Sequence, residues 1–221
     1  MPDKNSWSDA YCKEAARLFA GRVCFIGLLA SCTPGSAHGG VCVLLNRLLP
    51  DDFKRYRGVA DSFASLSPAC GFLGDVRMVR ALPPSDFFHF YYGTTPLLGR
   101  LEDLLPRPGA QEARLAVLSG AGALQRACCR NFIYQRDMAE LRGQYKAAVP
   151  VLQALHFTRT GSYLSTRAEL SGALHGADSL ILRNEAALLS GAAPLDCFDL
   201  FCETLLAWSQ RLISDFSPPT P

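Results

Sequence analysis

The sequence feature that most constrains the fold is a long apolar stripe near the C-terminal end of the chain, between residues 196 and 216. Its members recur at spacings of three and four residues, which is the period of one face of an α-helix. Fully burying one large apolar side chain is worth roughly 1.5–3 kcal/mol. The sequence therefore predicts a helix whose apolar face is covered. The apolar positions are Phe198, Phe201, Cys202, Leu205, Trp208, Leu212, Ile213 and Phe216.

The apolar stripe can be buried in either of two ways. The rest of the chain can pack on it as an ordinary core. Alternatively, a partner protein can receive it, because a terminal amphipathic helix can dock into another molecule's groove. Under the second alternative the partner-binding residues are Phe198, Phe201, Leu205, Trp208, Leu212 and Phe216.

The second half of the chain is predicted to be helical. Residues 111–148 have the periodicity of one or two helices, and Pro150 is expected to end or kink the pattern because it lacks an N–H. Thr166 and Glu169 have the spacing of a capping box, which predicts a helix running from there to about residue 190. Residues 110–216 are expected to pack as one unit, followed by a flexible tail over 217–221.

The first half, residues 1–106, is predicted to be a mixed helical and irregular part that ends where Pro and Gly cluster near residue 108. Residues 10–20 and 58–66 favour helix. The apolar run 23–30 fits either a continued helix or a short strand, and a second apolar run covers 41–49. Residues 75–82 alternate as a half-buried strand would. The aromatic run 87–92 indicates core or sheet, with an interface as the second interpretation. The predicted fold class is mainly α, a multi-helix globular domain with a small β element within 71–92.

Composition excludes several classes of protein. Apolar residues make up 49% and charged residues 19%, which excludes a largely disordered chain. A net charge of +2 gives no general reason to expect nucleic acid as a partner. The sequence has no run of about 20 apolar residues and no basic start followed by an apolar run, so we expect neither a transmembrane segment nor a secretory signal. The expected location is intracellular, in the cytoplasm or nucleus.

Two further compositional features are unusual. The chain has nine cysteines, which we expect to be free thiols in a reducing compartment. Arg greatly outnumbers Lys, a bias that is compatible with GC-rich coding, as in a compact DNA-virus genome or a GC-rich vertebrate gene. The first source is compatible with a viral structural or host-modulating role. Arg126, Arg130, Arg136, Arg142 and Lys146 line the middle helices; they fit surface pairing, such as Arg136 with Glu140 four residues on, or an Arg-rich interface.

The sharpest candidate for chemistry is a possible zinc site formed by Cys24, Cys32, His38 and Cys42. Structural zinc takes four Cys or His ligands, and the glycines around His38 would allow the backbone to fold tightly around an ion. Two observations oppose this reading. The chain has no C-x2-C pair, and Cys24 and Cys42 lie in apolar runs where buried thiols are ordinary.

No phosphate-binding loop, dinucleotide fingerprint, nucleophile elbow or H-E-x-x-H metal motif occurs in the sequence. The positive features favour packing and contact. The sequence therefore predicts a non-catalytic intracellular protein–protein interaction protein, either an adaptor or a subunit of a larger assembly, in a hetero-complex or a homo-oligomer. The alternative is a small enzyme or zinc-binding protein with its site around Cys24, Cys32, His38 and Cys42.

Overall fold

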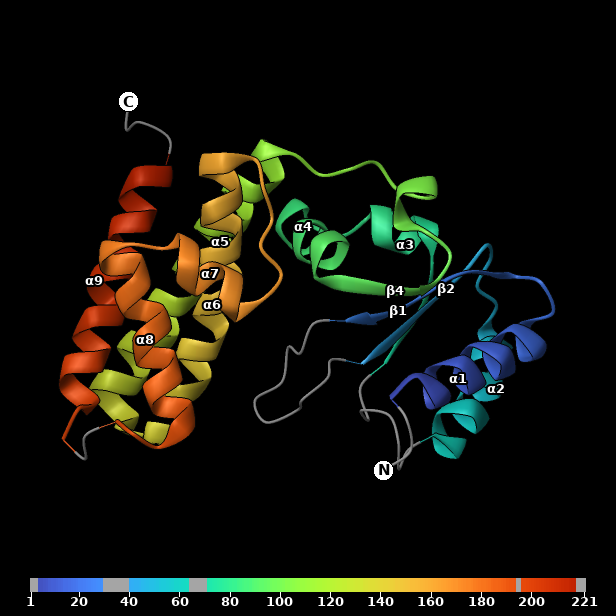
Figure 1. The fold of residues 1–221 in the computed structure, drawn as a ribbon, viewed down its shortest axis with the longest axis horizontal. Helices are drawn as coiled ribbons and strands as arrows, with labels where there is room; N and C mark the ends of the chain where they lie inside the picture. The colour runs from blue at the N-terminus through green and yellow to red at the C-terminus, as the bar shows by residue number, and fades with distance from the viewer. Residues whose placement is uncertain (1–3, 30–39, 64–70, 194–195, 218–221) are drawn as a thin grey trace. The chain divides into compact units, whose positions relative to one another are not determined.

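The computed structural model describes residues 4–29, 40–63, 71–193 and 196–217. In these residues the chain forms nine α-helices and a four-stranded sheet (Figure 1). The prediction of a mainly α protein with a small β element is confirmed. No helix in the described ranges is both long and apolar enough to cross a membrane.

The chain divides into two compact units. Unit 1 comprises residues 1–83 and 90–107, and unit 2 comprises residues 84–89 and 108–221. Helix α4 (Pro84–Gly93) contributes residues to both units.

Unit 1 is built around the sheet, in which the strand order is β3-β2-β1-β4 (Figure 1). The strands are β1 (Val23–Leu29), β2 (Val41–Leu45), β3 (Phe72–Asp75) and β4 (Thr94–Leu98). Strand β1 pairs antiparallel with both β2 and β4, whereas β2 and β3 run parallel. The apolar run 23–30, which the sequence left open between helix and strand, is thus a central strand.

Helices α1 (Lys4–Phe19) and α2 (Pro50–Ser62) provide the apolar cover for one face of this sheet. Tyr11, Ala15 and Phe19 of α1 and Val59 of α2 belong to the same buried cluster as the sheet residues. Tyr11 also shares a hydrogen bond of 2.5 Å between its hydroxyl and that of Tyr56, so the two helices are joined inside the core. The sheet residues of the cluster are Ile26, Val41, Val43, Leu45 and Leu73.

The region from residue 71 to 93 differs from the prediction. The strand expected over 75–82 is mostly helix α3 (Val76–Arg80), and strand β3 precedes it. Asp75 explains the change, because its carboxylate accepts a hydrogen bond from the backbone N–H of Met78 and caps the helix. The aromatic run 87–92 lies in helix α4, where Pro84 stands at the first helical position. Local capping chemistry therefore outweighed the alternating pattern.

Unit 2 is helical throughout its described part. It contains α5 (Ala110–Arg130), the π-helical turn η2 (Asn131–Gln135), α6 (Met138–Thr160), α7 (Arg167–Ala173), α8 (Gly176–Ser190) and α9 (Phe198–Phe216). Helix α5 packs against both α6 and α9, and α8 packs against α6 and α9. Figure 1 shows these four long helices lying side by side.

One expectation for unit 2 needs correction, one is narrowed and one is confirmed. Pro150 lies inside α6, which continues to Thr160, so of the two effects expected of this proline the ending of the helix is excluded. The single helix expected from residue 166 to 190 is two helices, α7 and α8, which separate at Leu174 and His175, where the backbone is extended. The capping box at the start of α7 is confirmed: the backbone N–H of Glu169 donates to the Thr166 hydroxyl, and that of Thr166 donates to the Glu169 carboxylate.

Candidate functional site

The apolar stripe on α9 lies on the inner face of unit 2. Leu205 and Leu212 are fully buried, and Trp208 donates a hydrogen bond of 2.7 Å from its indole N–H to the carboxylate of Asp178 on α8. Phe198 and Phe201 are also buried. In the described residues the stripe is therefore covered by the chain itself, as the first of the two alternatives requires.

Phe216, the last member of the stripe, differs from the others. Its side chain is half-buried, and the guanidinium of Arg114 lies over its ring at 5.3 Å from the ring centroid. The same guanidinium donates to the Phe216 carbonyl at 2.7 Å. The end of α9 is thus also held within unit 2, so a surface for a partner has to be sought elsewhere.

The predicted zinc ligands fall into two groups. Cys32 and His38 lie outside the described residues. Cys24 is half-buried on β1 and Cys42 is fully buried on β2, opposite Gly27. Three residues of strand, about 10 Å, separate Cys24 from Gly27. Cys24 and Cys42 therefore lie apart along the sheet, and the two residues that would complete the site are not among those described.

Other observations bear on the same thiols. Burial raises the pKa of the Cys42 thiol to about 12, so it is protonated at neutral pH. No group of three or more Cys, His, Asp or Glu side chains in the part of the chain that the structure describes could hold a metal ion. The zinc site stays a prediction that depends on residues outside the described ranges.

The turn between α5 and α6 has an unusual backbone. Helix α5 continues without interruption into the π-helical residues of η2, where the backbone N–H of Arg136 donates to the Asn131 carbonyl at 2.7 Å. Arg136 itself has a φ of +51°, in the left-handed region that non-glycine residues seldom adopt. π-Helical turns of this kind are rare and are often found at functional sites.

Side chains on both sides of the turn hold this backbone in place. Asn131 is fully buried, and its amide bridges the turn to Asp137. Phe132 stacks on Phe198 of α9, with ring centroids 6.4 Å apart. The guanidinium of Arg136 lies 5.1 Å from the Phe198 ring centroid and pairs with Asp199 at 2.8 Å. Arg136 therefore forms its ion pair with Asp199 of α9. The sequence spacing had predicted a pair with Glu140 instead.

The same turn exposes two large side chains to solvent. Ile133 is 63% exposed and Tyr134 is 80% exposed. Arg126 and Arg130 precede Tyr134 at intervals of four residues, so they extend the same helix face. Both arginines are exposed, and neither makes an ion pair or hydrogen bond with another described residue. We call these four residues, Arg126, Arg130, Ile133 and Tyr134, the η2 tip.

Sequence reasoning identified only part of the η2 tip. It singled out Arg126 and Arg130 as possible interface residues, whereas Ile133 and Tyr134 belong to none of the predicted sites. A signal was present in the three consecutive large residues 132–134. Three successive helical positions span about 200° around the axis, so they cannot all face one core.

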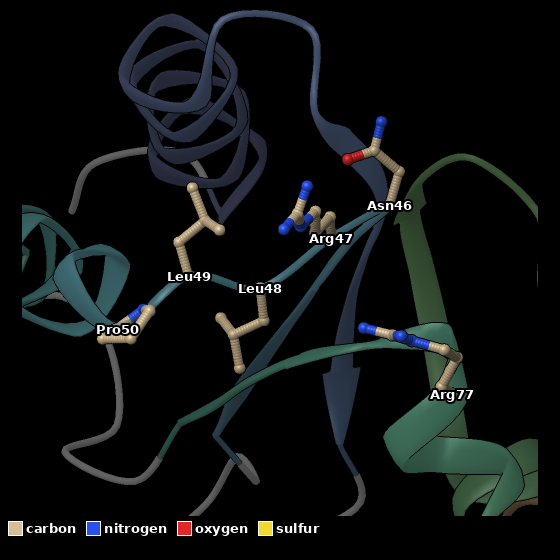
Figure 2. A pocket seen from close by; sticks show the side chains of 6 residues that line it. All are labelled: Asn46, Arg47, Leu48, Leu49, Pro50 and Arg77. Carbon is tan, nitrogen blue, oxygen red and sulfur yellow. The ribbon is translucent and has the colours of Figure 1, made fainter.

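Unit 1 contains a separate hollow of about 610 Å³ at the ends of two strands (Figure 2). Strands β2 and β3 are parallel, so their carboxyl ends meet at one edge of the sheet. The segment that follows β2 forms one wall, and Arg77, at the start of α3, forms the other. The lining residues are Asn46, Arg47, Leu48, Leu49, Pro50 and Arg77.

Two buried carboxylates stand beside this hollow, and each is already engaged. Asp52 accepts a two-pronged hydrogen bond from Arg22 at 2.7 and 2.8 Å and a further one from the backbone N–H of Leu49. Asp75 accepts from Arg77 at 2.9 Å and from the N–H of Met78. These donors hold the pKa of both carboxyl groups below the usual range. Both therefore stay ionised at neutral pH.

Buried charges in unit 2 are likewise paired. Asp178 receives hydrogen bonds from Arg159, Trp208 and Arg211. Burial acts to raise the pKa of this carboxyl, but the three donors outweigh it and the pKa is lowered. Glu185, which is 1% exposed, pairs with Arg167 at 2.8 Å. These pairs join α6, α7, α8 and α9 and indicate a structural role.

The chain matches none of the known protein families and none of the curated proteins with which it was compared. Its function therefore has to be inferred from its own residues.

Proposed function

We propose that this chain is a non-catalytic interaction protein, an adaptor or a subunit of a larger assembly, which binds another protein through the η2 tip. One observation carries the proposal. Ile133 is 63% exposed and Tyr134 is 80% exposed, although the turn that contains them is held in place by hydrogen bonds from Asn131. Large apolar side chains that are exposed together mark binding surfaces more often than isolated ones do.

The composition of the η2 tip supports a protein partner. Tyr and Arg are the residue types enriched at the centres of protein interfaces, where a few side chains supply most of the binding energy. The turn is also fixed before binding, because Asn131 bridges it and Phe132 stacks on α9. A preorganised surface loses less conformational entropy when it binds.

The charges of the η2 tip indicate the chemistry of the partner. Arg126 and Arg130 are exposed without an ion-pair partner among the described residues. A complementary surface would have an apolar pocket for Ile133 and Tyr134 with acidic side chains at its rim. We therefore infer a protein partner with an acid-rimmed apolar pocket.

The cellular setting is part of the same proposal. Seven cysteines in the described residues are free thiols, which supports a reducing, intracellular compartment, either cytoplasm or nucleus. A viral structural or host-modulating role is supported only by the excess of Arg over Lys.

The test is affinity purification of the tagged full chain from its native cells, followed by mass spectrometry and sizing. Three forms are compared: the wild type, the double variant Ile133→Ser/Tyr134→Ser, and the control Leu115→Ser. Leu115 is 38% exposed on the same helix, about 27 Å from Ile133 at 1.5 Å per residue. We expect a stoichiometric partner with the wild type and the control, and its loss with the double variant.

Two outcomes would contradict the proposal. Equal recovery of the partner by the double variant would show that the η2 tip is not the binding surface. A wild-type chain that stays monomeric with no stoichiometric partner would count against an interaction protein altogether. Zinc content of the purified protein would then test the alternative around Cys24, Cys32, His38 and Cys42.

A further inference from the structure

The hollow in unit 1 has a wall that is fixed by hydrogen bonds on both sides of Arg47. The backbone N–H of Asn46 donates to the Arg22 carbonyl at 2.9 Å, and the Arg22 guanidinium donates to the Arg47 carbonyl at 3.2 Å. Further along, the N–H of Leu49 donates to the carboxylate of Asp52 at 2.8 Å. The main chain that carries the Arg47 side chain is therefore held in one conformation.

A second guanidinium faces the same hollow from α3. Figure 2 shows the Arg77 side chain extending toward the segment that carries Arg47 and Leu48. Arg77 is 79% exposed and uses one of its terminal nitrogens for Asp75, which leaves its other N–H groups available. Arg47 makes no ion pair with any described residue.

The acidic groups beside the hollow do not neutralise this pair. Asp52 is occupied by Arg22 and by the N–H of Leu49, and Asp75 is occupied by Arg77 and by a backbone N–H. Arg47 is thus left without an ion-pair partner among the described residues, and the exposed Asp51 follows Pro50 of the wall in the first turn of α2. The N-terminus of α2 adds little to the binding of an anion, because the Asp52 carboxylate already accepts the hydrogen bond from the Leu49 N–H there.

The geometry of the donors selects the kind of anion. A guanidinium presents a planar fork of N–H groups that matches two oxygens of a phosphate or carboxylate. Two forks that face one hollow suit an anion with at least three acceptor oxygens and a charge near −2, as a phosphate monoester has. Leu48 and Leu49 add apolar surface to the lining.

We propose that the hollow between Arg47 and Arg77 binds a phosphoryl group, which it holds by charge-assisted hydrogen bonds from both guanidinium groups. The source of that group is either free phosphate or a phosphorylated side chain on another protein. The site lies in unit 1 and does not depend on the η2 tip in unit 2.

NMR titration of the 15N-labelled full chain tests the proposal. Inorganic phosphate is added at pH 7.5 to the wild type, to Arg47→Gln/Arg77→Gln and to the control Arg57→Gln, with sodium chloride at equal ionic strength as the blank. Arg57 is an exposed arginine on α2 outside the hollow. We expect saturable shifts at residues 46–50 and 77 in the wild type and the control, with affinity at least about tenfold weaker in the double variant.

A second titration distinguishes the two sources. A phosphoserine peptide is compared with its unphosphorylated form. Tighter binding of the phosphopeptide than of inorganic phosphate would show that the site takes a phosphorylated chain, and equal binding would show that it takes free phosphate. No saturable shift with either probe, or equal affinity in the folded double variant, would overturn the proposal. The unchanged backbone spectrum away from the hollow shows that the double variant is folded.

Discussion

The side-chain amide of Asn131 bridges the turn between α5 and α6 by two hydrogen bonds to the backbone of Asp137. Its Oδ1 accepts from the Asp137 N–H at 2.9 Å, and its Nδ2 donates to the Asp137 carbonyl at 2.9 Å. Asn131 is fully buried, so it replaces the backbone partners that the π-helical turn leaves open. The bridge spans the segment that contains Ile133 and Tyr134.

Replacing Asn131 by Ala should destabilise unit 2 by about 1–3 kcal/mol, because two hydrogen bonds are lost and buried polar groups are left unpaired. The same change should loosen the turn and speed amide hydrogen exchange at residues 132–136. Urea denaturation and hydrogen exchange measure the two effects. Gln135→Ala, at an exposed position of the same turn, serves as the control. Unchanged exchange in Asn131→Ala would contradict the bracing role.

The hydroxyl of Tyr145 lies in the core of unit 2, where it donates to the Phe201 carbonyl at 2.9 Å and accepts from Asn184 at 3.1 Å. Tyr145→Phe should lower the free energy of unfolding by about 1–3 kcal/mol, since it leaves two buried polar groups without their partner. Tyr134→Phe is the matched control, because that tyrosine is 80% exposed and should change stability by at most about 0.5 kcal/mol. Equal values for the two variants would refute this assignment.

Gly120 on α5 allows close approach to α6. A Cβ at this position would lie 2.5 Å from a methyl carbon of Val151, which is 2% exposed. Gly120→Ala should therefore destabilise unit 2 by about 1–3 kcal/mol despite the higher helix propensity of Ala. Val151→Ala in the same chain should recover part of the loss. Thermal or urea unfolding of both single variants and the double variant gives the coupling, and strict additivity would show that the two positions do not interact.

The stability of unit 2 should depend on the ionisation of Asp178. Its pKa is lowered in the folded chain, so the carboxyl binds a proton more weakly when folded than when unfolded. The resulting stabilisation is complete above the unfolded pKa, about 3.9, and is lost as the pH falls below it toward the folded value. Unfolding measured from pH 7 to pH 3 should show wild type and Asp178→Asn converging in acid. A constant difference across that range would contradict the prediction.

Helix α9 offers a direct test of its role in the core. Trp208→Asp/Leu212→Asp places two carboxylates at positions that are 3% and 0% exposed, and it should unfold unit 2. The control Leu200→Asp changes a residue of the same helix that is 63% exposed, and it should remain folded. Circular dichroism and thermal unfolding distinguish these results. A folded double variant that loses a partner would restore the stripe as an interface.

The helices of the second half could be predicted because their signals are local. The stripe from Phe198 to Phe216 and the capping box at Thr166 each depend on residues within a few turns of one another. The candidate site was harder to predict. Arg126 and Arg130 could be predicted as basic positions on the helix surface. The exposure of Ile133 and Tyr134 could not, because it follows from a π-helical turn, which the apolar periodicity of the sequence does not predict.

Local sequence patterns are enough to predict that the chain is mainly helical, where most helices of unit 2 begin, and that the face of α9 must be buried. The residues that bury that face, and the segments near residue 71 that become strands, are known only from the three-dimensional fold. Periodicity and capping act between neighbours in the chain, whereas burial depends on contacts between residues that are distant in the chain. Trp208 with Asp178 and Tyr145 with the carbonyl of Phe201 are two such contacts, 30 and 56 residues apart along the chain.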